Sequence, residues 1–174
     1  MRKLSMEELG KKNARQLEET TKLPVRIILD NIRSLHNIGS IFRTADALMV
    51  ESIYLCGICA VPPNREIQKA ALGATETVRW EYFPSTMQAV NKVKIDGFKV
   101  IAIEQTDSSI DLADFQTENI PMALIFGNEV NGVSDEVLPF VDQAIEIPQF
   151  GTKHSFNVSV AAGIVLYQLK TDRK

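Results

Sequence analysis

Short apolar runs alternate with helix-type patterns along most of this chain. The runs that have the composition of β-strands are Val25–Leu29, Ile53–Leu55, Val78–Tyr82, Phe98–Ile103, Met122–Phe126 and Gln143–Ile147. Strands that are separated by helices need crossover connections, so they predict a mainly parallel sheet with helices on both faces. The pattern therefore indicates an α/β fold.

Helical segments lie between and after these runs. Ser34–Met49 has the pattern of one helix, and Pro84 can open a second helix over about residues 84–94. A third is predicted from about Ser155 to Lys170, where almost no polar face remains. Such a helix has to be buried nearly all round, either within the core or against another subunit.

The first residues form a separate segment. Ser5 and Glu8 have the spacing of a capping box, which predicts a helix over about residues 5–19 that stops before Pro24. We therefore divide the chain into an N-terminal helical extension, residues 1–23, and a main domain, residues 24–174. The extension carries six basic residues against four acidic ones. This excess is compatible with a modest basic face or with an ordinary solvated helix.

Composition places the chain among ordinary globular proteins. Its 174 residues are 45% hydrophobic and 24% charged, which fits one compact domain. No run of about 18 apolar residues suggests a membrane span, and the first residues lack the apolar centre of a signal peptide. We expect a cytoplasmic protein with no membrane partner. The net charge of −3 argues mildly against a nucleic-acid partner, although the distribution of charge matters more than its total.

Cys56 and Cys59 form a lone C-x-x-C motif. A redox pair or half of a zinc site would have this spacing, but no second pair follows and the histidines are only His36 and His154. Two small buried thiols at the end of a strand fit the surrounding apolar residues better. We predict no metal site, and we interpret His154 as a loop or surface residue.

The first candidate for chemistry is the segment 37–47, Asn-Ile-Gly-Ser-Ile-Phe-Arg-Thr-Ala-Asp-Ala. It places Arg43 on a helix shortly after a turn that contains glycine. The guanidinium matches phosphate geometry, and the free amides of a helix N-terminus attract anions as well. The alternative is a solvated Arg43, or one paired with Asp46, since such helix-face pairs are common and nearly neutral in energy.

Two later segments each follow a strand with a polar loop. Glu129, in the sequence Gly-Asn-Glu after Phe126, is either an exposed turn carboxylate or an acceptor for a substrate hydroxyl or Arg43. Ser155 and Asn157 can cap the last helix, a role that is compatible with catalysis.

Standard nucleotide motifs are absent, because no G-x-G-x-x-G follows an early strand and no P-loop sequence occurs. A cofactor can instead lie on bent backbone at Gly127 and Gly151, with Ile147 and Phe156 as apolar walls.

Taken in order, the three segments resemble the motifs of the SpoU/TrmH-type RNA ribose 2′-O-methyltransferases of the SPOUT superfamily, over roughly residues 25–169. The resemblance implies a C-terminal deep trefoil knot, a homodimer and S-adenosylmethionine as cofactor. It places cofactor-binding backbone at Ile103, Gly127, Ile147 and Phe156, where the family usually has Leu in place of Phe156. The active-site residues that it implies are Asn37, Arg43, Glu129, Ser155 and Asn157.

The implied substrate is RNA. Residues 102–106 and 109–112 are similar to the corresponding stretch of eukaryotic tRNA guanosine ribose methylases, which favours tRNA over rRNA. Arginine stays protonated in proteins. We therefore expect Arg43 to clamp a phosphate and stabilise developing alkoxide charge, while phosphate oxygen, Glu129 or water takes the proton. Two alternatives stay open: a non-catalytic RNA-binding or assembly protein on the same fold, and an RNA base methyltransferase.

Overall fold

Seven parallel strands form one sheet in the computed structural model, which describes residues 1–5, 8, 10, 22–117 and 120–173. The strand order is β3-β2-β1-β6-β4-β7-β5. The strands are β1 (Leu23–Asp30), β2 (Val50–Cys56), β3 (Arg79–Phe83), β4 (Lys99–Ile103), β5 (Ile110–Asp111), β6 (Met122–Phe126) and β7 (Gln143–Glu146). The predicted α/β class, the parallel sheet and all six predicted strands are confirmed, and the two-residue β5 is an addition.

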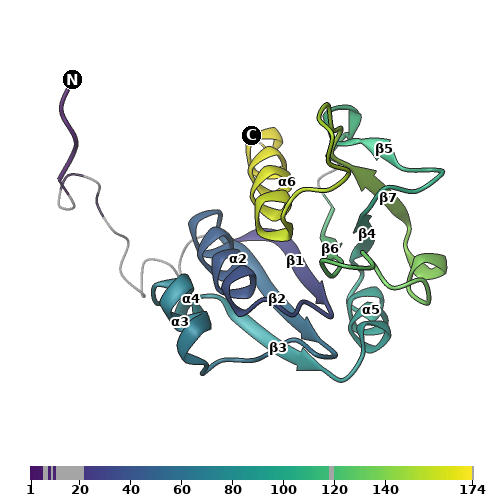
Figure 1. Cartoon of the computed structure of the whole chain (residues 1–174), viewed down its shortest axis with the longest axis horizontal. Coiled ribbons are helices and arrows are strands. Elements are labelled where there is room, and N and C mark those ends of the chain that lie inside the picture. The colour runs from purple at the N-terminus through teal and green to yellow at the C-terminus, as the bar shows by residue number, and fades with distance from the viewer. Residues whose placement is uncertain (6–7, 9, 11–21, 118–119, 174) are drawn as a thin grey trace.

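Helices cover both faces of the sheet (Figure 1). On one face lie α2 (Leu35–Ala47), α3 (Arg65–Ala71), α4 (Ala74–Thr77) and α6 (Val158–Asp172). On the other lies α5 (Thr86–Ile95). Two short 3₁₀ turns, Leu112–Asp114 and Leu138–Phe140, complete the elements. The central strand β6 is apolar throughout and buried on both sides, as is typical of parallel sheets.

Side-chain caps fix where the helices begin. Ser34 caps α2 by accepting from the amide of Asn37, and Ser85 caps α5 by accepting from Gln88. The second helix therefore starts at Thr86 rather than at Pro84. Asn157 caps α6, so the last helix starts at Val158 and not at the predicted Ser155. In both cases a polar residue closer to the helix provides the cap.

The last helix differs from its prediction in burial. One face of α6 is buried, through Val158, Ala162, Val165, Leu166 and Leu169, and packs beside α2. The opposite face is open: Val160, Ile164 and Tyr167 are 48%, 36% and 64% exposed. Within the single chain, only one side of this helix is buried, so the first expected alternative, burial within the core, is not met on the open side; packing against another subunit stays a prediction.

The N-terminal helix predicted over residues 5–19 lies outside the described residues for most of its length. Ser5 and Glu8 are described, and they make both bonds of a capping box: the Ser5 amide donates to Glu8 Oε2 at 2.7 Å, and the Glu8 amide donates to Ser5 Oγ at 3.3 Å. In the described part of the chain, no helix has both the length and the apolar character that a membrane crossing needs.

Cys56 and Cys59 are both buried and unbonded to each other, as predicted for small core thiols. The Cys59 thiol donates to the Leu29 carbonyl at 3.3 Å and accepts from the Ile32 amide at 3.1 Å. Burial raises the pKa of Cys56 above its ordinary value and raises the pKa of Cys59 to about 11. These thiols therefore belong to the core at the end of β1.

Both thiols are expected to resist a thiol reagent such as Ellman's reagent at pH 8 in the native protein. The reactive species is the thiolate, and raised pKa values together with burial keep each thiol protonated and covered. Two equivalents should react once the protein is unfolded in guanidinium chloride. Rapid native labelling of either cysteine, located by mass spectrometry after digestion, would contradict this account.

Candidate functional site

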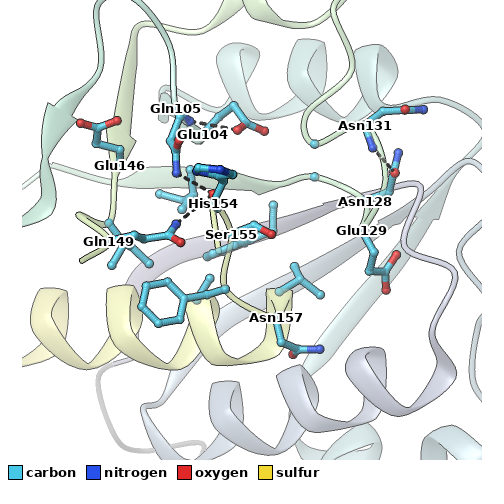
Figure 2. A pocket seen from close by; sticks show the side chains of 18 of the residues that line it. Glu104, Gln105, Asn128, Glu129, Asn131, Glu146, Gln149, His154, Ser155 and Asn157 are labelled. Carbon is cyan, nitrogen blue, oxygen red and sulfur yellow. Dashed lines mark hydrogen bonds between the residues drawn. The ribbon is translucent and has the colours of Figure 1, made fainter. Parts of the chain in front are cut away.

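A cavity of about 490 Å³ lies at the carboxyl ends of β4, β6 and β7 (Figure 2). Parallel strands bring their carboxyl ends to one edge of the sheet, so the loops that follow them converge there. The walls come from residues 103–105, 126–132, 145–147, 149 and 154–158, with Ala161 from α6. Its volume is within the range of small-molecule sites.

The four residues predicted to hold a cofactor all line this cavity. Ile103 ends β4, Gly127 follows β6, Ile147 follows β7 and Phe156 precedes α6. A Cβ atom on Gly127 would lie 2.0 Å from the Gly132 carbonyl carbon and 2.1 Å from the Val133 nitrogen. Only glycine fits at position 127, because the loop folds back directly against its backbone.

The charge inside the cavity is acidic. Glu104, Glu129 and Glu146 line it, and none of the described lining residues is Lys or Arg. Carboxylates around a concave site favour a cationic ligand over an anionic one. The apolar side chains of Ile103, Ile147 and Phe156 provide walls beside these charges, so the site is suited to a ligand with both cationic and apolar parts.

Asn37 joins three segments that are far apart in sequence. Its Nδ2 donates to Glu129 Oε1 at 3.0 Å, and its Oδ1 accepts from Asn157 Nδ2 at 3.1 Å. These partners are 92 and 120 residues away. The carboxylate can only accept a hydrogen bond, so it fixes which end of the Asn37 amide faces each partner. Three of the five predicted active-site residues thus form one directed chain, Asn157 to Asn37 to Glu129.

Glu129 is held in its charged form. Partial burial alone would raise its pKa, but hydrogen bonds from backbone amides and from Asn37 outweigh burial and lower the pKa below the ordinary value for glutamate. The Arg33 amide is one of these donors, at 3.5 Å. Glu129 is therefore an ionised acceptor at neutral pH, at the mouth of the cavity.

Asn157 has two roles, as the sequence suggested. Its Oδ1 accepts from the Ser159 amide at 2.9 Å and from Ser159 Oγ at 2.6 Å, which caps α6, while its Nδ2 reaches Asn37. Ser155 precedes the first residue of α6, Val158, and it is exposed and lines the cavity. Capping thus falls to Asn157, and the Ser155 hydroxyl faces the cavity region.

Arg43 is not brought together with the other four residues. It lies on the exposed face of α2 and does not line the cavity. Six residues separate it from Asn37, so its side chain leaves the helix roughly 120° away from that of Asn37. Asp46, the alternative partner, accepts from Thr77 Oγ1 at 2.5 Å. The structure gives Arg43 no hydrogen bond or ion pair within the described residues, which leaves its guanidinium free for an external anion.

Sequence reasoning missed the residues that hold the returning loop. The His154 carbonyl accepts from Gln105 Nε2 at 2.9 Å and from Gln149 Nε2 at 3.2 Å. His154 is exposed in a loop, as expected, but it also lines the cavity (Figure 2). Their position in the sequence could have indicated such a role, because Glu104 and Gln105 directly follow a buried parallel strand, at the edge of the sheet where binding sites form.

Comparison with known proteins places these features in a family. The profile described as the SpoU rRNA Methylase family matches residues 24–167. The 23S rRNA (guanosine-2′-O-)-methyltransferase RlmB of Neisseria meningitidis is 33% identical over 90% of this chain and 62% of its own length. The tRNA (guanosine(18)-2′-O)-methyltransferase of Aquifex aeolicus is 31% identical over 94% of this chain and 76% of its own length.

The fold is also found among solved structures. The AdoMet-bound rRNA methyltransferase from Sinorhizobium meliloti superposes with a TM-score of 0.81 at 26% identity. The match covers 91% of this chain and 60% of that protein. This chain thus spans less than two thirds of the Neisseria and Sinorhizobium proteins that it matches.

Replacing Asn37 by Ala is expected to raise the pKa of Glu129. The Asn37 bond stabilises the carboxylate and not the carboxylic acid, so its loss favours protonation. An NMR titration of carboxyl-labelled glutamate measures this directly. Because the lowered pKa stabilises the fold only above the pKa of unfolded glutamate, stability gained from this group should fade as pH drops through the native pKa.

Ser155→Ala is the matched control for this titration, since Ser155 lines the same cavity without a bond to Glu129. The Glu129 pKa should be unchanged in that variant. An unchanged pKa in Asn37→Ala would show that the Asn37 bond has no electrostatic effect on Glu129.

Proposed function

This chain belongs to the SpoU rRNA methylase family, and we propose that it is an S-adenosylmethionine-dependent RNA methyltransferase that methylates a ribose 2′-hydroxyl. The observation that carries the proposal is the convergence of Asn37, Glu129 and Asn157 at the mouth of a cavity lined by all four expected cofactor positions. The relatives from Neisseria and Aquifex are named as guanosine 2′-O-methyltransferases, which supports the ribose as the site of reaction.

The cavity fits the proposed cofactor. S-adenosylmethionine carries a sulfonium and an ammonium group, which suit the carboxylates, and an adenosine part that suits the apolar walls. Backbone at Ile103, Gly127 and Ile147 would hold the adenosine part, and Phe156 would cover it. When bound, the cofactor supplies a methyl group on positively charged sulfur. The AdoMet-bound Sinorhizobium structure supports this assignment.

The residues around the cavity would align the substrate hydroxyl. Methyl transfer is an in-line displacement, so the protein mainly needs to orient the hydroxyl and handle its proton. Glu129 is charged at neutral pH and can accept a hydrogen bond from the hydroxyl, while Ser155 and Asn157 offer further polar contacts. The proton passes to Glu129, to a substrate phosphate oxygen or to water.

Arg43 would bind the phosphate beside the methylated nucleotide. Its guanidinium is exposed and has no partner within the described residues, and its fork matches two phosphate oxygens. In this role it holds the RNA and stabilises the charge that develops on the ribose oxygen.

We also propose that two copies of this chain form a homodimer through the open face of α6. Val160, Ile164 and Tyr167 form an exposed apolar surface on α6, and the half-exposed Phe156, which lines the cavity, shortly precedes this helix. A second copy covering this surface would lie beside the cavity. Since Arg43 leaves α2 on a different side from Asn37, the phosphate clamp for this cavity is supplied by the partner copy in our proposal.

The C-terminal deep trefoil knot is part of the same proposal. In the sheet, β7 lies next to β4 and away from β1. After β7, residues 147–157 lead the chain back to α6, which packs against α2. Gln105 and Gln149 hold the returning segment by the carbonyl of His154, close to the loop after β4. This path supports a threaded return of the chain.

We favour tRNA over rRNA as the substrate, on the similarity of residues 102–106 and 109–112 to eukaryotic tRNA guanosine ribose methylases. The named relatives act on either RNA, so they support RNA as the substrate class. Residues 1–23 would be an extension that adds basic groups to the RNA contact, and residues 24–174 would be the methyltransferase domain. The proposed location of the protein is the cytoplasm.

The deciding experiment incubates the purified protein with methyl-labelled S-adenosylmethionine and with unmodified tRNA or rRNA in separate reactions, followed by digestion to nucleosides and mass spectrometry. A labelled 2′-O-methylnucleoside from tRNA is expected. Label on a base would make the protein a base methyltransferase. Cofactor binding without label in either RNA would favour a non-catalytic RNA-binding protein.

Arg43→Lys is expected to reduce methyl transfer at saturating RNA by about 10- to 100-fold, the value of one lost charge-assisted hydrogen bond. Lysine keeps the charge but cannot bind phosphate through a two-pronged fork. Cofactor affinity should not change, because Arg43 lies outside the cavity. Arg65→Lys, on the exposed surface of α3, is the matched control. Equal turnover of the Arg43→Lys and wild-type proteins would show that two-pronged binding of phosphate by the guanidinium is not required.

Ile164→Glu is expected to weaken the dimer roughly 100-fold by placing an unpaired charge in the apolar interface. Light scattering after gel filtration measures this change. The resulting monomer should still bind S-adenosylmethionine but lose methyl transfer, because it lacks the partner's Arg43. Ile95→Glu, an 84% exposed position on α5, should remain dimeric and active. Full activity in a monomeric variant would show that Arg43 serves its own subunit.

A further inference from the structure

We propose that Glu104 and Asp30 are positioning residues that clamp the loop carrying Gly127 and Glu129, and so set the cofactor affinity of the cavity. Glu104 directly follows β4 and Asp30 ends β1, and the two carboxylates accept hydrogen bonds from two successive backbone amides, Val133 and Ser134. The kinetic part of this inference rests on the proposed function. The structural part does not depend on it.

Glu104 holds the first of the two amides. Its Oε2 accepts from the Val133 amide at 2.9 Å, and its Oε1 accepts from the Gln105 amide at 2.9 Å. A Cβ atom on Gly132 would lie 2.1 Å from Glu104 Oε2, and Gly132 has a φ of +69°. The glycine is therefore required twice: for its backbone conformation, and to leave room for the carboxylate.

Asp30 holds the second amide from the other side of β6. It is completely buried at the end of β1, and its Oδ2 accepts from the Ser134 amide at 2.7 Å. Its Oδ1 accepts from Thr86 Oγ1 at 2.5 Å and from Asn31 Nδ2 at 2.8 Å. A buried carboxylate is costly unless it is well hydrogen-bonded. These three donors tie the loop to β1 and to the start of α5.

The loop itself is a small closed unit. The Asn128 amide donates to the Gly132 carbonyl and the Gly132 amide to the Asn128 carbonyl, both at 3.0 Å. Asn128 Oδ1 also accepts from the amides of Val130 and Asn131, each at 2.9 Å. Because these bonds join both limbs, a shift at Val133 is transmitted across the loop.

That shift would reach both functional groups of the loop. Gly127 lies directly against the Val133 backbone, so its place in the cavity wall depends on where Val133 is held. Glu129, at the tip of the loop, accepts a hydrogen bond from Asn37. The clamp therefore fixes the cavity wall and the Glu129 carboxylate together, without either clamping carboxylate having to contact the reacting atoms.

The test compares Glu104→Ala with Glu146→Ala. Both residues line the cavity as carboxylates, but Glu146 bonds to Ser109 Oγ at 3.1 Å and has no bond to the loop among the described residues. In Glu104→Ala, the Val133 amide should exchange with solvent at least about 10-fold faster by NMR, and S-adenosylmethionine should bind about 10-fold more weakly by calorimetry. In Glu146→Ala, Val133 exchange should equal that of the wild type.

Kinetics separate positioning from simple destabilisation. The KM for RNA should stay within about twofold in Glu104→Ala, whereas the KM for the cofactor rises. Asp30→Asn provides a second variant, in which Ser134 exchange should increase. Because Asp30 is fully buried, that variant can fail to fold; Glu104→Ala then carries the test alone.

Unchanged Val133 exchange in Glu104→Ala would overturn the clamp, even if cofactor affinity fell, since Glu104 would then act by direct contact. Faster Val133 exchange in Glu104→Ala with unchanged cofactor affinity would overturn the link between the clamp and the cofactor site. Failure of the proposed function is distinguishable from both: the wild type would methylate neither RNA, while Val133 and Ser134 exchange could still be measured.

Discussion

The hydrogen bonds of Asn37 are the constraint on which the arrangement of this site depends. One side chain at the start of α2 binds the loop after β6 through Glu129 and the cap of α6 through Asn157. These segments meet because the parallel sheet directs its carboxyl-terminal loops to one edge. Asn157 is also the N-cap of α6, so the residue that bonds to Asn37 at the site also marks the start of the last helix. Asn157 thus contributes both to the start of α6 and to the arrangement of the site.

Much of the fold could be predicted because the sheet is buried on both faces. Strands such as Met122–Phe126 are continuous apolar runs whose short length is typical of strands buried on both faces. The pattern did not predict β5, which has only two residues, or α3, whose seven residues are too few for a repeated apolar stripe. The starts of α5 and α6 were misplaced because the sequence offers two start signals for each helix: Pro84 and Ser85 before α5, and Ser155 and Asn157 before α6.

The structure brings together four of the five candidate active-site residues, while Arg43 lies apart from them. Glu129 follows the buried strand β6, Ser155 and Asn157 precede α6, and Asn37 lies in the first turn of α2, so these four meet at one edge of the sheet. The separation of Arg43 from Asn37 was also present in the sequence, since six residues on a helix turn the side chain well away. The bonds of Glu104 and Asp30 could not be foreseen, because they join strands β4 and β1 to a loop whose path no pattern of polar residues specifies.

Charge gives a physical reason for this separation of Arg43. A cavity lined by Glu104, Glu129 and Glu146 attracts a cationic cofactor, and the same charges repel the phosphates of RNA. If an arginine lay inside the cavity, it would pair with these carboxylates and weaken the attraction for the cation. On the proposed function, the two requirements are compatible only if the phosphate is bound outside the carboxylate-lined space, with just the ribose hydroxyl reaching in. The exposed face of α2, where Arg43 lies, meets that condition, and the open face of α6 allows a second copy to bring such a surface to the cavity.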